Sequence, residues 1–155
     1  CCKETKLQSF QFRIVHRILA LNGFLHRIGL CETDLCSFCS TKTETIEHFF
    51  YECTFVKQLL QEFYEWYVSY NPLDVFDFHI QANVFFGVKD SSLLFNHFLL
   101  ILKFYIYSCK FRKSIPNLNE VKQIFKSVRN LEYYIANRNG QPDKFYKKWA
   151  NFLNI

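Results

Sequence analysis

Four potential metal ligands lie close together in the sequence and constrain the fold more than any other feature. Cys36 and Cys39 are separated by two residues, and His48 follows after eight more. Cys53 comes four residues after that histidine. A Cys-x2-Cys turn places two thiolates on one side of a tetrahedral Zn²⁺, and a histidine on a short helix with a cysteine just past its end completes the tetrahedron. The spacing C-x2-C-x8-H-x4-C therefore predicts a zinc site made by these four residues.

The donor set indicates which metal binds and what it does. Sulfur-rich ligation favours Zn²⁺ over Mg²⁺ or Ca²⁺, although iron is chemically possible. Four protein ligands leave no open position for an activated water, so we expect a structural site and not a catalytic one. Such a site contributes roughly 10–16 kcal/mol to ordering a segment that has little apolar packing of its own.

Other interpretations of the cysteines are weaker. A Cys-x2-Cys pair is also a redox motif, but no βαβ pattern surrounds it here. Disulfides need an oxidising compartment that nothing in the sequence indicates, and the seven cysteines are an odd number. A chance grouping of four unrelated residues is the remaining alternative. Cys31 lies outside the tight turn, and we expect it, like Cys1, Cys2 and Cys109, to bind no metal.

The rest of the chain is predicted to be helical. Its 155 residues correspond to one ordinary domain, and 50% of them are hydrophobic. Four glycines and three prolines are too few for an all-β sandwich or a glycine-rich phosphate loop. Apolar residues instead recur with the period of an α-helix. We predict an all-α fold with an aromatic-rich core, in which a small C-x2-C/H-x4-C zinc knuckle is inserted between helices.

Chain breakers divide the first half into segments. A first helix is expected to end at Asn22-Gly23 and to bury one face made of Leu7, Phe10, Ile14, Ile18 and Leu21. The segments expected after it are a helical turn at 24–28, a loop at 31–45, a short helix at 46–51 and a longer helix at 55–70 that stops before Pro72.

The second half begins with residues 73–90, whose pattern is ambiguous and predicts an irregular or short helical linker. Ser91 or Ser92 then caps a long buried helix that runs to about Arg112. After Pro116, Asn117 and Glu120 resemble a capping box. The helix that follows is expected to bury Val121, Ile124, Phe125, Val128, Leu131 and Ile135, and a last short helix is expected to carry Phe145, Trp149 and Phe152.

Charge is distributed unevenly along the chain. The formal net charge of +5 divides into +4 over residues 1–30, −7 over 31–90, +1 over 91–109 and +7 over 110–155. The predicted zinc ligands lie in the acidic middle. We therefore expect any polyanion to contact the two basic ends.

No membrane or secretory segment is evident. The first residues are polar and lack the apolar region of a signal peptide. The most apolar stretch, 93–107, is interrupted by Asn96, His97 and Lys103 and is too short to span a bilayer. We expect an intracellular protein of the nucleus or cytoplasm. The chain contains no methionine, which predicts that it is a fragment or a processed piece of a longer polypeptide.

The metal motif and its flanks resemble a known family. The segments that carry the resemblance are SFQFRIVHRILALNGFLHRIGL at 9–30, LCSFC at 35–39, ETIEHFFYEC at 44–53, YIYSCKFR at 105–112 and KKW at 147–149. They resemble the zinc-binding domain that follows the polymerase in reverse transcriptases of non-LTR (LINE-type) retrotransposons, strongly over about 7–70 and more loosely beyond. The resemblance assigns the same four residues as zinc ligands. It also identifies Glu44-Thr45 as the residues that usually precede the histidine ligand in this family.

The resemblance also implies what the chain does not do. The parent polyprotein would be an RNA-directed DNA polymerase, but polymerase activity needs a Tyr-x-Asp-Asp-type motif, and this sequence has no adjacent pair of aspartates. Nothing in it resembles an endonuclease, so we expect no enzyme activity. The expected organisation is a zinc-binding helical region at 1–72 and a helical C-terminal tail at 73–155, packed as one domain.

Basic side chains near the two ends are candidates for contact with RNA or DNA. They form three groups: Lys122, Lys126 and Arg129 with Tyr133 on one helix face, Arg13 and Arg17 on the first helix, and Lys144, Lys147 and Lys148 near the end of the sequence. Cations follow phosphates, and Tyr133 is placed to stack on a base or to pair with Arg129. Each group by itself is more often a solvated helix face.

The expected partners are RNA or DNA and the upstream polymerase domain of the same polyprotein, without a membrane or a small-molecule substrate. Two alternatives stay open. In the first, the chain is a protein-interaction module that docks on the polymerase core through aromatics such as Trp66, Tyr70 or Trp149. In the second, it is a degenerate relic of a retrotransposon.

Overall fold

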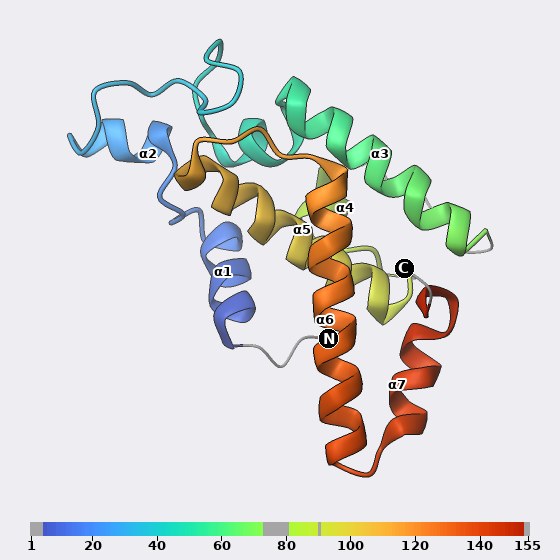
Figure 1. The fold of residues 1–155 in the computed structure, drawn as a ribbon. Helices are drawn as coiled ribbons and strands as arrows, with labels where there is room; N and C mark the ends of the chain where they lie inside the picture. Colours follow the sequence, from blue (N-terminus) through green and yellow to red (C-terminus); the bar gives the residue numbers. More distant parts are fainter. Residues whose placement is uncertain (1–4, 73–80, 90, 154–155) are drawn as a thin grey trace.

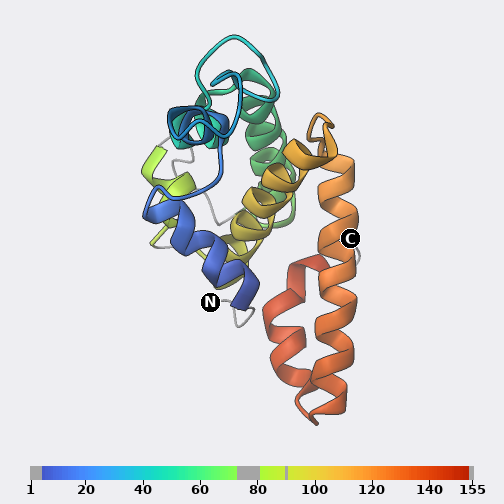
Figure 2. The ribbon, with the colours of Figure 1, turned by 90° about the vertical axis from the view of Figure 1, so that its left-hand side faces the viewer.

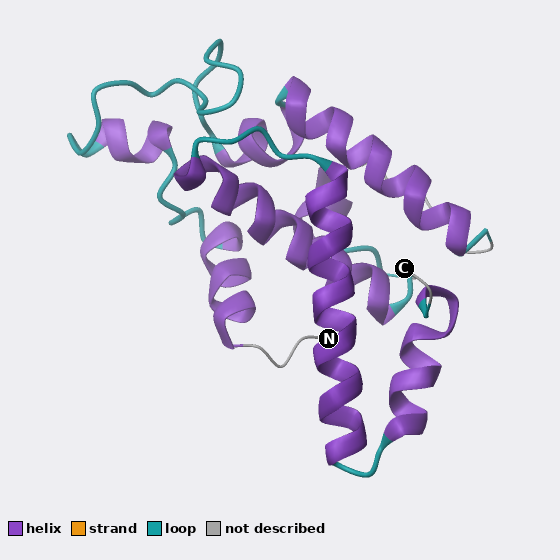
Figure 3. Ribbon diagram, viewed as in Figure 1, coloured by secondary structure: helices purple, strands orange, loops and turns teal. Residues whose placement is uncertain are grey.

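The computed structural model of the protein describes residues 5–72, 81–89 and 91–153 (Figure 1). Within these ranges the chain is helical and has no β-strand, which confirms the predicted all-α fold (Figure 3). The elements are α1 (Thr5–Val15), α2 (Asn22–Arg27), the short turn η1 (His48–Glu52), α3 (Thr54–Tyr70), α4 (Gln81–Phe86), α5 (Leu93–Arg112), α6 (Leu118–Arg138), α7 (Pro142–Trp149) and the turn η2 (Ala150–Phe152). Of the ambiguous segment 73–90, residues 73–80 lie outside the described part, and a short helix follows them.

α5 is the central helix of the fold. Its buried residues lie on every side of the helix and include the polar His97 and Lys103. α1 and α6 both pack against it, and they lie on opposite sides of α5 in Figure 2. A helix that is apolar all round is stable only when neighbours cover it on all sides. In the described ranges, no helix combines the length and the apolar character that crossing a membrane requires.

Aromatic rings fill the core between α3, α5, α6 and the C-terminal turns. The rings of Phe98 and Phe125 stack with centroids 4.1 Å apart, and Trp66 stacks on Phe125 at 5.7 Å. Phe152 brings η2 onto this cluster, 5.2 Å from Phe98 and 5.6 Å from Tyr67. Stacked and edge-on ring pairs add favourable quadrupole interactions to the large apolar area that each ring buries. The aromatic-rich core was correctly predicted.

Two predicted helix starts are confirmed by their capping bonds. The Ser92 hydroxyl accepts a hydrogen bond from the Phe95 amide at 3.0 Å, at the start of α5. At the start of α6, the Asn117 side-chain oxygen accepts from the Glu120 amide, and the Asn117 side-chain nitrogen donates to the Glu120 carboxylate, both at 3.0 Å. These bonds satisfy amide groups that the first turn of a helix leaves without an intrahelical partner.

The prediction of one helical face over residues 7–21 was wrong in its second half. α1 ends at Val15, and Arg17 has a φ of 57°, which a right-handed helix cannot contain. Ile18 is therefore 51% exposed, whereas Leu19 and Leu21 are buried in the linker. Asn22 begins α2 rather than closing the first helix.

The C-terminal half of α6 also departs from the prediction. Val121 and Phe125 are fully buried, but Leu131 and Ile135, which were expected in the core, are 56% and 46% exposed. This half of the helix extends beyond the body of the protein together with α7, as an antiparallel hairpin that Figure 2 shows from the side. We call α6 and α7 together the C-terminal hairpin. Among the described residues, no third helix packs against its far end to bury the apolar side chains (Figure 2).

Candidate metal centre

A small knuckle between α2 and η1 presents the first two cysteines. Leu35 and Thr43 form an isolated antiparallel bridge, and next to it the Cys36 amide donates to the Lys42 carbonyl at 2.8 Å. The intervening turn closes with a bond from the Ser40 amide to the Cys36 carbonyl, and Ser40 adopts a φ of 53°. The backbone thus folds back on itself between Cys36 and Lys42, and both cysteines of the Cys-x2-Cys pair lie in this turn.

The other two donors flank the short turn η1. His48 is its first residue, and the His48 amide donates to the Thr45 hydroxyl at 3.0 Å. Cys53 directly precedes α3, and its amide donates to the His48 carbonyl at 2.8 Å. One turn of helix therefore fixes the distance between the third and fourth donors.

The structure brings these four side chains into one cluster. Their donor atoms all lie within 4.8 Å of one another. The sulfurs of Cys36 and Cys53 are 3.9 Å apart, and the Cys39 sulfur lies 3.2 Å from Nε2 of His48. A Zn²⁺ tetrahedron with ordinary bond lengths has edges of roughly 3.8 Å between two sulfurs and roughly 3.5 Å between sulfur and nitrogen. The spacing and the chemistry of the donors fit a metal ion of this kind.

Neighbouring groups support the donors. The Phe38 amide points at the Cys36 sulfur at 3.5 Å, and the Thr41 hydroxyl donates to the Cys39 sulfur at 3.1 Å. Nδ1 of His48 is buried without a hydrogen-bond partner, and the nearest carboxylate oxygen, of Glu52, is 4.0 Å away. In metal sites the second ring nitrogen of a histidine ligand commonly faces such a carboxylate, which orients the ring.

Hydrogen bonds within the cluster also shift the acidity of its thiols. The bond between Cys36 and Cys53 is the largest influence on both: it raises the pKa of Cys36 far above its ordinary value and lowers the pKa of Cys53. For Cys39, burial acts to raise the pKa, but hydrogen bonds from Thr41 and His48 outweigh it and the pKa is lowered. Two of the three thiols are therefore biased toward thiolate, which is the form that binds metal.

From the sequence, Glu44 was named only as one of the residues that precede the histidine, and Lys110 was not identified as a residue of this centre. Glu44 is completely buried, and Lys110, at the far end of α5, pairs with its carboxylate. A carboxylate buried to this extent requires a cation or hydrogen-bond donors as partners. The partner lies 66 residues further along the chain, and no local pattern identifies it.

The remaining described cysteines lie outside the cluster. The Cys31 thiol donates to the Thr33 carbonyl at 3.1 Å. Cys109 is buried in α5, and its sulfur accepts a bond from Arg112 at 3.1 Å. Neither belongs to the group of donors that could hold a metal ion.

Comparison with known proteins agrees with the geometry of this centre. Residues 2–59 match the family described as zinc-binding in reverse transcriptase. The matched segment contains all four clustered donors, and the match confirms the resemblance to a reverse-transcriptase zinc-binding domain that the sequence indicated. A domain of this family is an accessory metal-binding unit rather than a catalytic one. No curated protein and no solved structure matches the chain.

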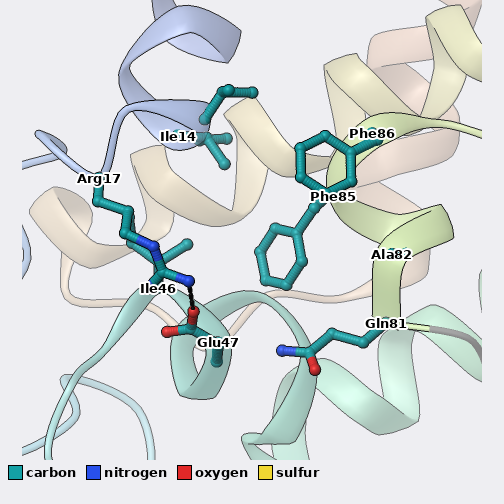
Figure 4. Close-up of a pocket in the computed structure, with 9 residues that line it drawn as sticks. Ile14, Arg17, Ile46, Glu47, Gln81, Ala82, Phe85 and Phe86 are labelled. Atoms are coloured by element: carbon teal, nitrogen blue, oxygen red, sulfur yellow. Dashed lines mark ion pairs between the residues drawn. The ribbon is translucent and has the colours of Figure 1, made fainter.

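The structure places several of the candidate nucleic-acid residues in contacts within the protein. Arg17 forms an ion pair with Glu47 on one side of a pocket, and α4 lines the opposite side (Figure 4). Arg129 donates to the Leu153 carbonyl at 2.7 Å, and Lys148 donates to the Glu132 carboxylate at 2.7 Å. These three cations hold protein segments together, so only part of their charge is available to an external anion.

The other candidates differ in exposure and in their contacts. The Lys122 amine lies 5.8 Å from the ring centre of Trp66, and Lys144 donates to the Gln141 side chain at 3.1 Å. Tyr133 packs against Phe145, at 5.2 Å between ring centres. The remaining three, all exposed, are Arg13, Lys126 and Lys147. Arg13 lies on α1, Lys126 on α6 and Lys147 on α7.

Proposed function

We propose that the chain is a non-catalytic, zinc-binding module of a LINE-type reverse transcriptase polyprotein, and that it holds template RNA or target DNA. The family match and the four clustered donors support the metal-binding part. The resemblance of the flanking segments to LINE-type elements supports the parentage. The knuckle lies in the acidic part of the sequence, so its role in this proposal is to stabilise the fold.

Metal analysis of the purified chain tests the metal-binding part. We expect one equivalent of zinc in the wild-type protein. Cys39→Ser and His48→Ala each remove one of four donors and are expected to lose most of the bound metal. The matched control is Cys31→Ser, which alters a thiol outside the cluster and retains the metal. One equivalent of zinc retained in both ligand variants would refute the assignment.

The C-terminal hairpin carries the argument for nucleic-acid contact. Residues 118–149 contain seven basic and three acidic side chains. Lys126 and Lys147 are exposed, and so are the rings of Tyr134 and Tyr146, at 62% and 47%. Cations that follow phosphates and exposed rings that stack on bases are the two components of single-strand binding. Because the hairpin extends beyond the body of the protein, a strand reaches both helices without contact with the knuckle (Figure 2).

Binding assays across a salt series test this contact. The double variant Lys126→Ala/Lys147→Ala is expected to weaken binding to single-stranded RNA and DNA, and to flatten the salt dependence by about one unit per lost phosphate contact. Lys57→Ala removes an exposed cation from α3 and is expected to change little. Absence of wild-type binding at all salt concentrations would overturn the proposal.

An exposed apolar stripe on α6 favours a second candidate function, docking on the polymerase core. Leu131, Tyr134 and Ile135 follow helical spacing and are 56%, 62% and 46% exposed. Trp149 was expected from the sequence to be one of the exposed aromatics in such a contact. This prediction was wrong, because Trp149 is fully buried. Co-purification with the upstream polymerase discriminates between the two functions. Leu131→Ser/Ile135→Ser removes the apolar contact without adding charge. It abolishes co-purification if the stripe docks, and it leaves the salt-dependent part of nucleic-acid binding unchanged.

A further inference from the structure

The Glu44 carboxylate, inside the knuckle, is surrounded by donors. It is 0% exposed, and one of its oxygens accepts from the Asn22 amide at 2.8 Å. The other oxygen accepts from the Ser37 amide at 2.6 Å. Ser37 lies directly between Cys36 and Cys39 in the turn that presents their thiols. The carboxylate therefore fixes the backbone of that turn to the start of α2.

The cation that balances this carboxylate comes from a distant part of the chain. The Lys110 side chain is 8% exposed, and its amine pairs with Glu44 at 2.5 Å. The amine also donates to the Ser37 hydroxyl at 2.9 Å and to the side-chain oxygen of Asn22. An ammonium group has three N–H donors, and here each has an acceptor in or beside the knuckle.

This arrangement crosses the boundary of the matched family segment. The match ends at residue 59, whereas Lys110 lies in the last turn of α5. The amide and the hydroxyl of Ser37 are both bound by the pair. A rotation of the Cys36–Cys39 turn breaks both bonds and leaves one oxygen of the buried Glu44 carboxylate without the donor that it has here, which is unfavourable.

We propose that Glu44 and Lys110 are positioning residues of the metal centre, and that their buried ion pair couples metal binding in the knuckle to the packing of the C-terminal end of α5. The pair holds the Cys36–Cys39 turn in the geometry that binds metal. By linkage, metal binding in turn stabilises the last turn of α5 by the same free energy. The inference rests on metal binding at the four-donor cluster, which the wild-type titration tests separately.

Metal competition titrations on the full chain test the first half of the proposal. Lys110→Met and Glu44→Gln are each expected to weaken Zn²⁺ binding about 10–100-fold against a chelator of known affinity, as other groups that orient metal ligands do. Lys113→Met is the matched control, because it removes an exposed lysine three residues away at the end of the same helix. An affinity of Lys110→Met within twofold of the control would overturn the proposal.

Hydrogen exchange tests the reciprocal half. Addition of Zn²⁺ is expected to slow amide exchange at residues 109–114 in the wild type and in Lys113→Met, but not in Lys110→Met. Equal protection of this segment in all three proteins would contradict the coupling. A role confined to static packing predicts no response of these amides to the metal.

A double variant separates positioning from the cost of an unpaired buried charge. Glu44→Gln/Lys110→Met removes both charges, and its unfolding midpoint is expected to recover toward the wild-type value. Its zinc affinity is expected to stay at least tenfold weaker, because the turn no longer has its charged supports. Recovery of affinity together with stability would show that the single variants act only through the unpaired charge, and it would overturn the proposal.

Discussion

The knuckle and the aromatic core are stabilised in different ways. In the core, rings from α3, α5, α6 and η2 contact one another, and many contacts each contribute a little. The knuckle has one isolated bridge, a few rings and a set of specific polar and metal-binding side chains. Loss of one member therefore has different consequences in the two regions. Removal of one ring from the core lowers the free energy of unfolding by part of its value. Removal of one metal-binding side chain from the knuckle abolishes the metal site.

The largest expected effect is that of metal removal on the thiols of the knuckle. In the metal-loaded protein, the three clustered cysteines are expected to resist a thiol reagent. After chelation the knuckle opens, because the metal contributes roughly 10–16 kcal/mol to ordering such segments, and three further thiols react per chain. Thiol titration before and after chelation measures the difference. An unchanged number of reactive thiols would mean that the knuckle is ordered by its protein contacts alone.

A core substitution is expected to change stability without changing the metal site. Phe125 is fully buried and stacks on Phe98, so Phe125→Ala is expected to cost about 3–5 kcal/mol in urea unfolding. The control, Phe111→Ala, truncates a side chain that is 63% exposed and costs far less. Zinc affinity is expected to remain within twofold of the wild-type value in both. A large loss of affinity in Phe125→Ala would show that the two regions are less separate than the structure indicates.

Sequence patterns identified most of what is local in this fold. The spacing of Cys36, Cys39 and His48 predicted their convergence, because a tight turn and a single helical turn fix the distances between neighbouring donors. The capping residues Ser92 and Asn117 marked two helix starts because they bond within their own first turn. In each case the relevant partners lie within about a dozen residues.

What the sequence did not reveal depends on distant contacts. Whether Leu131 is buried depends on how far α6 extends beyond its neighbours, and periodicity carries no information about this. The residue that pairs with Glu44 comes from the end of α5. Arg17 was predicted to lie on a helix face, but a positive φ ends α1 before it and Glu47 binds its side chain.

A buried lysine two helical turns before Lys110 on α5 gives a smaller effect of known sign. Lys103 donates to the Gln11 side chain at 2.7 Å and to the Phe85 carbonyl at 3.1 Å, and burial lowers its pKa from 10.5 to about 7. Because the pKa of Lys103 is lower in the folded than in the unfolded state, the unfolded chain binds the proton first as the pH falls. The free energy of unfolding is therefore highest above pH 10.5 and decreases as the pH falls toward 7. The wild-type free energy of unfolding is expected to rise between pH 7 and pH 10 by on the order of 3 kcal/mol more than that of Lys103→Met. Parallel pH profiles of the two proteins would contradict the shift.

The smallest expected effect is at the junction between α5 and α6. Asn117→Ala removes the capping bond to the Glu120 amide and is expected to cost about 1 kcal/mol. Asn119→Ala, two residues further along on the exposed side of the helix, is the control. Thermal unfolding of the two variants measures the difference, and equal midpoints would remove the cap from the account. Zinc affinity is expected to stay unchanged in both.

Hydrogen exchange of the full chain with and without zinc tests the central claim most directly. The account predicts that zinc removal abolishes protection at residues 36–53, weakens it at the end of α5, and leaves the buried amides of α3 and α6 protected. Uniform loss of protection across all helices would show one cooperative unit, and unchanged protection in the knuckle would show that metal does not order it. Either result would contradict the account.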